Sequence, residues 1–200
     1  METNQLKQIQ KYVQERLPLI PWFIIPIYIF LLAHGEIARY NFGVLYCVLL
    51  GIIFFRIFDD YFSWNYHLVN SKFEYLTFGK SFLLIFLLML GLLFTSSCFF
   101  ILPINIALLI IAFIFLNFVF YMGLKHFKAV VFIQLLKYPV LFFAVSLMTE
   151  EANPLWSIWG SICFIAHGVF KDGFGKQNTI ITISLFSLPV IIKYTLRYLV

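Results

Sequence analysis

The chain has 200 residues, of which 62% are hydrophobic and only 12% are charged, and its mean hydropathy is +0.96. Soluble domains are about half apolar and about a quarter charged, so this composition excludes a soluble globular domain and predicts an integral membrane protein. The formal charge of +5 does not indicate a nucleic-acid partner, because basic residues in a membrane protein first report its orientation.

Residues 1–18 are polar and precede the first apolar run. Apolar residues recur there at helical spacing, at Leu6, Ile9, Val13 and Leu17. This pattern predicts a short amphipathic helix that lies on the membrane surface. No small-residue cleavage site follows the first apolar run, so the segment is not expected to be a secretory signal.

Residues 19–200 contain apolar runs long enough to cross a bilayer. A bilayer core of about 30 Å needs about 20 apolar residues per helix. We therefore expect an all-α fold, a single membrane domain over residues 1–200 with about seven transmembrane helices. The predicted spans cover residues 19–35, 41–60, 81–101, 104–122, 129–148, 155–171 and 179–199. The turn at Leu102-Pro103 should join the third and fourth spans as a hairpin.

The distribution of lysine and arginine predicts the orientation of the chain. Most of these residues lie before the first span or in the loops after the second, fourth and sixth spans. Because cytoplasmic loops retain positive charge, we expect a cytoplasmic N-terminus, with the protein in a bacterial inner membrane. The loop after residues 41–60 then faces the cytoplasm.

Two adjacent carboxylates, Asp59 and Asp60, stand at the end of the second predicted span. An ionised aspartate costs several kcal/mol at membrane depth unless it is paired, hydrated or bound to a metal, so such residues are candidates for a functional site. Asp60, Ser63 and His67 are spaced i, i+3 and i+7, which places them on one face of a helix.

Two interpretations of these residues remain open on spacing alone. Carboxylates with a hydroxyl and an imidazole can hold a divalent cation, and oxygen-rich sites with phosphate partners are usual for Mg²⁺. Alternatively, the aspartates cap a helix or pair with Arg56 and Lys72.

The stretch from Asp59-Asp60 through Ser63 and His67 to Gly79-Lys80 resembles the first aspartate-rich motif of the UbiA superfamily of intramembrane prenyltransferases. That motif reads Asn-Asp, two residues, Asp, three residues, Asp, and is followed by a glycine before the next span. Here Ser63 and His67 stand at the third and fourth motif positions. Two weaker similarities keep the same order, at Tyr121-Met122-Gly123-Leu124-Lys125 and at Phe170-Lys171-Asp172-Gly173.

The resemblance implies a helical bundle around a cavity that opens toward the cytoplasm and to lipid. It implies a prenyltransferase, or a related enzyme that ionises an isoprenyl diphosphate with Mg²⁺, in which Mg²⁺ and basic residues stabilise charge on the leaving group. The roles carried over are catalytic for Asp59, Asp60 and Lys125. Diphosphate binding falls on Arg56, Ser63, His67 and Lys171, and metal binding on Asp59, Asp60 and Asp172.

Two other classes of function remain open. Because Ser63 and His67 replace carboxylates, and because the chain is short for the family it resembles, a non-catalytic membrane scaffold or lipid-binding subunit is the main alternative. A transporter is a further alternative, based on Lys137, His167 and prolines inside predicted spans, because ionisable residues at membrane depth can mark a cavity or a relay. Snorkelling or local hydrogen bonding would explain the same two residues without a function.

Overall fold

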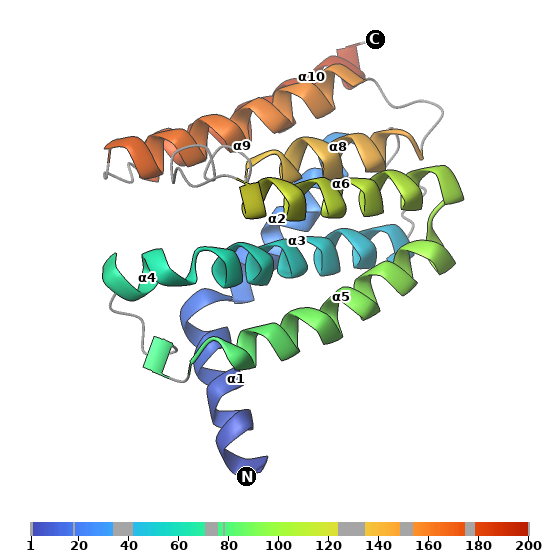
Figure 1. Ribbon diagram of the computed structural model, residues 1–200. Coiled ribbons are helices and arrows are strands. Elements are labelled where there is room, and N and C mark those ends of the chain that lie inside the picture. The colour runs from blue at the N-terminus through green and yellow to red at the C-terminus, as the bar shows by residue number, and fades with distance from the viewer. Residues whose placement is uncertain are drawn as a thin grey trace. The chain divides into compact units, whose positions relative to one another are not determined.

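The computed structural model describes residues 2–17, 19–33, 42–70, 76–77, 79–123, 135–148, 154–174 and 179–199. Within these ranges it describes the side chains except at 2–6, 19–23, 66, 70, 168–174, 179–183 and 197–199. The elements are α1 (Glu2–Arg16), α2 (Leu19–Ala33), α3 (Phe42–Phe62), α4 (Trp64–Asn70), α5 (Ser81–Ile101), α6 (Ile104–Gly123), α8 (Lys137–Ser146), α9 (Pro154–Phe174) and α10 (Thr179–Leu199) (Figure 1).

The all-α prediction is confirmed over the described residues, which contain helices and no strands. Three described helices, α3, α5 and α6, are long and apolar enough to cross a membrane. Helices α2, α8, α9 and α10 overlap the other predicted spans, and apolar stretches of α2, α8 and α10 are shorter. The number of about seven spans therefore stays a prediction.

The predicted turn between the third and fourth spans is confirmed at Leu102-Pro103. Helix α5 ends at Ile101, and Leu102 has an extended backbone, with φ −96° and ψ 154°. The carbonyl of Pro103 then accepts hydrogen bonds from the backbone N–H groups of Ile106 and Ala107, both at 3.0 Å. Proline fits the start of α6, because the first N–H groups of a helix have no partner within the helix.

The chain divides into two compact units, and the first comprises Met1–Pro26 and Gly43–Leu102. In this unit α3 packs against α5 through aromatic rings, with the ring centroids of Phe54 and Phe94 5.6 Å apart. A Cβ atom added at Gly91 of α5 would lie 3.2 Å from Phe54. The absence of a side chain at Gly91 thus allows the Phe54 ring to approach the α5 backbone closely.

The second unit comprises Ile27–Phe42 and Pro103–Val200, and α9 packs against both α8 and α10 in it. The Tyr28 ring makes edge contacts with Phe164 and Phe186, with centroids 5.7 and 5.3 Å away. At Gly160 of α9, an added Cβ would lie only 2.5 Å from the Phe142 ring. Glycine is therefore required there by packing rather than by backbone conformation.

Lys193 lies inside α10 and is buried. Its Nζ donates hydrogen bonds to the carbonyl oxygens of Leu31 and Leu32, at 2.7 and 2.8 Å, in the last turn of α2. The last carbonyls of a helix have no partner within the helix and carry partial negative charge. The ammonium group of Lys193 therefore satisfies and neutralises the end of α2.

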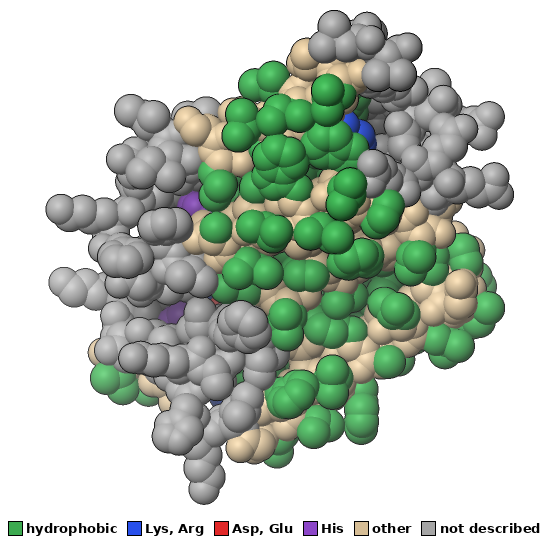
Figure 2. All heavy atoms as spheres, turned by 90° about the horizontal axis from the view of Figure 1, so that it is seen from above, with side chains coloured by type: hydrophobic (Ala, Val, Ile, Leu, Met, Phe, Trp, Pro, Cys, Tyr) green, Lys and Arg blue, Asp and Glu red, His purple; other side chains and the backbone are tan. Residues whose placement is uncertain are grey.

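Hydrophobic side chains cover much of the described surface seen in Figure 2. Large apolar residues on α5 and α6 are strongly exposed, including Met89, Leu92, Phe100 and Phe115. Exposure of this kind would be costly in water but is expected for helices that contact lipid. The surface thus agrees with the membrane assignment made from composition.

Candidate functional site

The helical register continues from α3 into α4, although the structure interrupts the helix at Ser63. The Ser63 N–H donates to the Asp59 carbonyl at 2.9 Å, and the His67 N–H donates to the Ser63 carbonyl at 3.0 Å. Both hydrogen bonds follow the i to i−4 pattern of an α-helix. Asp60 and His67 therefore lie on one face, as their spacing predicts, with His67 Nε2 3.5 Å from Asp60 Oδ1.

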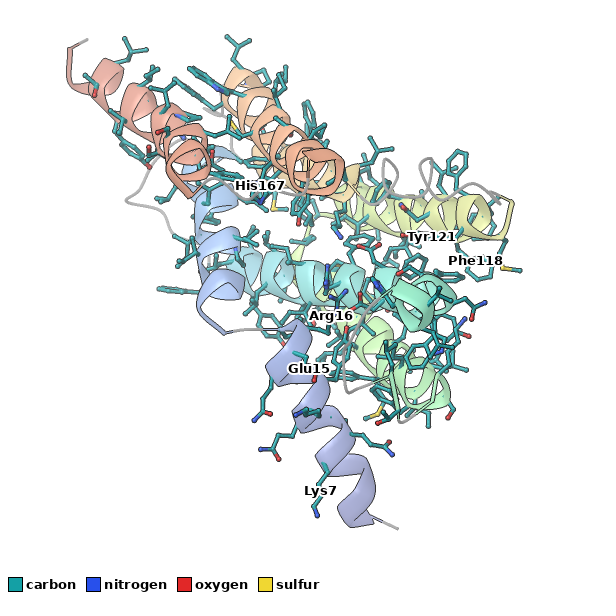
Figure 3. The ribbon with its side chains drawn as sticks, turned by 90° about the vertical axis from the view of Figure 1, so that its left-hand side faces the viewer. Lys7, Glu15, Arg16, Phe118, Tyr121 and His167 are labelled. Carbon is teal, nitrogen blue, oxygen red and sulfur yellow. The ribbon has the colours of Figure 1, made fainter. Side chains whose placement is uncertain are left out.

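Asp60 is almost completely buried, with 1% of its side chain exposed, and its carboxylate is bound by residues of α1. Tyr12 Oη donates to Oδ2 at 2.8 Å, and Arg16 Nε donates to the same oxygen at 3.0 Å. Arg16 Nη2 donates to Oδ1. Arginine thus engages both carboxylate oxygens, the geometry that makes such pairs strong and directional. Figure 3 shows Arg16 at the end of α1 directed toward α3.

Arg56 lies one helical turn before Asp60, with its Nε 3.5 Å from Asp60 Oδ2. Of the two interpretations left open by the sequence, pairing between Asp60 and Arg56 is therefore confirmed. Asp60 thus faces two guanidinium groups, one from α1 and one from its own helix. Lys72, the other proposed partner, lies outside the described residues.

Tyr12 connects this cluster to α5. Its side chain is fully buried, and its ring makes edge contacts with Phe82 and Phe86, each with a centroid distance of 6.1 Å. Burial raises the pKa of the Tyr12 hydroxyl well above its ordinary value, and the adjacent Asp60 carboxylate raises this pKa further. Tyr12 consequently stays a neutral hydrogen-bond donor to Asp60 at physiological pH.

Asp59 and Ser63 are also buried beside the cluster. Ser63 Oγ donates to the backbone carbonyl of Asp59 at 2.5 Å. The serine hydroxyl is therefore used in a local helix contact of the kind that hydroxyl residues commonly make with the carbonyl one turn earlier. Its predicted role in phosphate binding stays a prediction.

The remaining predicted site residues lie where the structure gives no side chain. Lys125 is outside the described residues, and the side chains of Lys171 and Asp172, at the end of α9, are not described. The predicted meeting of Asp172 and Lys125 with the Asp59-Asp60 pair therefore stays a prediction.

The Asp60 carboxylate is occupied by protein hydrogen-bond donors, and binding of Mg²⁺ at this end of α3 stays a prediction. Both oxygens of the carboxylate already accept hydrogen bonds from cationic or neutral donors. The neighbouring His67 imidazole is a poor ligand for this cation, which prefers oxygen. No group of three or more His, Cys, Asp or Glu residues that could hold a metal ion occurs in the described part of the chain.

Tyr12 and Arg16 are site residues that the sequence analysis did not identify. They are spaced i and i+4, so they share a face of α1, and this face borders the apolar stripe that contains Ile9 and Val13. One signal was available, because a buried carboxylate needs a cationic partner and Arg16 is the last basic residue before the first apolar run.

The two ionisable residues predicted inside later spans have aromatic neighbours. Lys137 is buried at the start of α8, with Nζ 5.5 Å from the centroid of the Tyr138 ring. His167 of α9, labelled in Figure 3, has its ring 5.6 Å from that of Phe186. These contacts are typical of cation–π and aromatic packing, and a role of the two residues in a relay stays a prediction.

The chain matches no protein-family model, no curated protein and no solved structure.

Proposed function

We propose that the chain is a UbiA-like intramembrane protein that binds an isoprenyl diphosphate at the cytoplasmic end of α3. One observation carries the proposal. A buried carboxylate at the end of a candidate membrane span faces two arginines from separate helices, within a segment similar to an aspartate-rich motif. This site would lie at headgroup depth in a bacterial inner membrane, in a bundle of about seven spans with its N-terminus in the cytoplasm.

The enzymatic form of the proposal is prenyl transfer. When an allylic diphosphate ionises, the carbon–oxygen bond breaks and its electron pair leaves with the diphosphate. Preorganised cations that face the departing oxygens stabilise this charge. Arg56 and Arg16 are the described residues suited to that task, with Lys125 and Lys171 as the further basic residues. Asp60 would then hold Arg16 in place rather than bind a metal, and a Mg²⁺ requirement would depend on Asp59 and Asp172.

A lipid-binding scaffold without transferase activity is the second candidate. The specific observation in its favour is that Tyr12 and Arg16 already occupy the Asp60 carboxylate. A transferase that used Asp60 as a metal ligand would have to break these bonds in each cycle, and breaking a buried ion pair costs several kcal/mol.

Pyrophosphate release separates these candidates. The purified chain is placed in phosphatidylcholine nanodiscs and supplied with farnesyl diphosphate and prenyl acceptors, with Mg²⁺ or with EDTA. Transferase activity predicts Mg²⁺-dependent release that Asp60→Asn abolishes and that Lys7→Gln, a change at an exposed residue of α1, leaves intact.

The other outcomes of this experiment support the scaffold or contradict a proposal. Binding of farnesyl diphosphate without release identifies the scaffold. Unchanged turnover in Asp60→Asn removes Asp60 from the mechanism. Neither binding nor release under any condition would contradict both candidates.

A further inference from the structure

Two of the three cysteines in the chain meet between α3 and α5. The thiols of Cys47 and Cys98 are hydrogen-bonded to each other, and the two residues are buried, with 3% and 0% exposed. The third cysteine, Cys163, lies in the other compact unit and donates to the backbone carbonyl of Leu185 at 3.3 Å. The fold thus brings together two thiols that stand far apart in the sequence.

The packing of α3 against α5 supports this pairing independently. The Phe54 ring lies over Gly91, where an added Cβ atom would be 3.2 Å from it. Cys47 comes seven residues before Phe54, and Cys98 comes seven residues after Gly91. Seven residues are about two helical turns, so each cysteine shares a face with the contact residue of its own helix. Because the two helices run antiparallel (Figure 1), the same step along each helix leads from one contact to the other.

The cysteine pair lies at the end of the two helices that is opposite to Asp60. Cys47 is five residues from the start of α3 at Phe42, and Cys98 is three residues from the end of α5 at Ile101. Each cysteine is therefore within about 8 Å of its helix end. In the orientation proposed above this end faces the periplasm, the compartment of a bacterial cell in which disulfides form and persist.

We propose that Cys47 and Cys98 form a disulfide that joins α3 to α5 at their periplasmic end. The oxidant is the disulfide of a periplasmic protein. One cysteine attacks it as the thiolate, which gives a mixed disulfide and releases one thiol of the oxidant. The other cysteine then attacks the mixed disulfide, forms the new sulfur–sulfur bond and releases the second thiol. Two electrons and two protons pass to the oxidant, and Cys163 remains a thiol.

Burial of the two thiols determines when this exchange takes place. A protein oxidant cannot reach buried sulfur atoms, so the exchange occurs while α3 and α5 assemble and before their packing is complete. The same burial then shields the disulfide from reductants. The bond closes a long loop that contains Asp60, and such a closure stabilises a fold mainly by restricting the unfolded chain. This role of the cysteines requires no lipid ligand.

Counting thiols in the full chain tests this inference. Cells that express the chain are precipitated with acid and dissolved in SDS with N-ethylmaleimide, which blocks every free thiol. Reduction and labelling with PEG-maleimide then shift the gel band once for each thiol released from a disulfide. We expect two shifts in the wild type and in Cys163→Ser, and none in Cys47→Ser or Cys98→Ser.

The wild-type count decides the proposal whether or not a variant folds. A wild-type chain with no shift after reduction would overturn the disulfide. A band of twice the mass before reduction would show that the bond joins two chains, and would overturn a bond between α3 and α5 of one chain. Two shifts that persist undiminished in cells without a periplasmic thiol oxidant would overturn the oxidant named here, whereas their loss supports it.

Unfolding by SDS tests the stabilising role of the bond. The wild type should unfold at a higher SDS fraction without reductant than with it, and Cys47→Ser should unfold at the same fraction in both conditions. Equal wild-type midpoints would overturn this role. Binding of farnesyl diphosphate is measured separately, so failure of the disulfide and failure of the proposed function give different results.

Discussion

The bonds between Arg16 and Asp60 predict a large stability loss when Arg16 is replaced. Arg16→Met keeps much of the apolar length of the side chain but leaves the Asp60 carboxylate buried with one fewer cation. Removing one partner of a buried ion pair costs about 3–5 kcal/mol. Because Tyr12, Arg56 and His67 still surround Asp60, we expect the lower end of that range, about 3 kcal/mol.

The assay is equilibrium unfolding of the detergent-solubilised chain by SDS, followed by circular dichroism. Lys7→Met is the matched control, because it removes a positive charge from an exposed position on the same helix and should change stability by less than about 0.5 kcal/mol. The double variant Arg16→Met/Asp60→Asn should be more stable than Arg16→Met alone by at least about 1 kcal/mol, since it no longer buries an uncompensated charge.

Two results would contradict a buried Arg16–Asp60 ion pair. A loss below about 1 kcal/mol for Arg16→Met is the value expected of a solvent-exposed pair, and it would mean that α1 is not held on α3 by this contact. A double variant less stable than the single one would show that Asp60 is not stabilised mainly by Arg16.

Three further predictions follow from particular contacts. Gly160→Ala should destabilise the chain by about 2 kcal/mol in the same assay, because the added Cβ would lie 2.5 Å from the Phe142 ring. Gly123→Ala is the control and should leave stability unchanged, because nothing lies within 4 Å of its added Cβ. Equal losses in the two variants would contradict tight packing at Gly160. Lys193→Met should lower the free energy of unfolding by about 2 kcal/mol, because two charge-assisted hydrogen bonds to the end of α2 are lost. An unchanged unfolding midpoint would show that these two hydrogen bonds do not stabilise the chain. Folding raises the pKa of Tyr12, so above about pH 10 the unfolded chain loses the Tyr12 proton more readily than the folded chain does. The stability advantage of the wild type over Tyr12→Phe should therefore hold below about pH 10 and shrink above it. A constant difference between pH 8 and pH 11 would contradict burial of a neutral Tyr12.

Local sequence patterns were sufficient to predict the helices and one part of the site. Helices α5 and α6 follow from apolar length alone, and the turn between them follows from Pro103, which cannot continue the preceding hydrogen-bond pattern. The closeness of Asp60 and His67 follows from helical geometry, since residues i and i+7 share a face. These predictions depend only on neighbours within about two turns of one helix.

Local patterns did not predict the contacts between residues that are far apart in the sequence. Arg16 and Tyr12 are 44 and 48 residues from Asp60, so their pairing depends on how α1 packs against α3 and α5. The burial of a carboxylate predicts that some cation accompanies it, but not which one. Lys193 shows the same limit, because it bonds carbonyls 161 and 162 residues away, whereas the pattern around it indicates only a basic residue within an apolar helix.

The most direct measurement is an experimental structure of the full chain with a non-hydrolysable farnesyl diphosphate analogue. We expect phosphate oxygens within hydrogen-bond distance of Arg56, with Asp60 still bonded to Tyr12 and Arg16. An analogue bound elsewhere in the bundle, or a diphosphate that appears only when Mg²⁺ joins it to Asp60, would contradict this expectation.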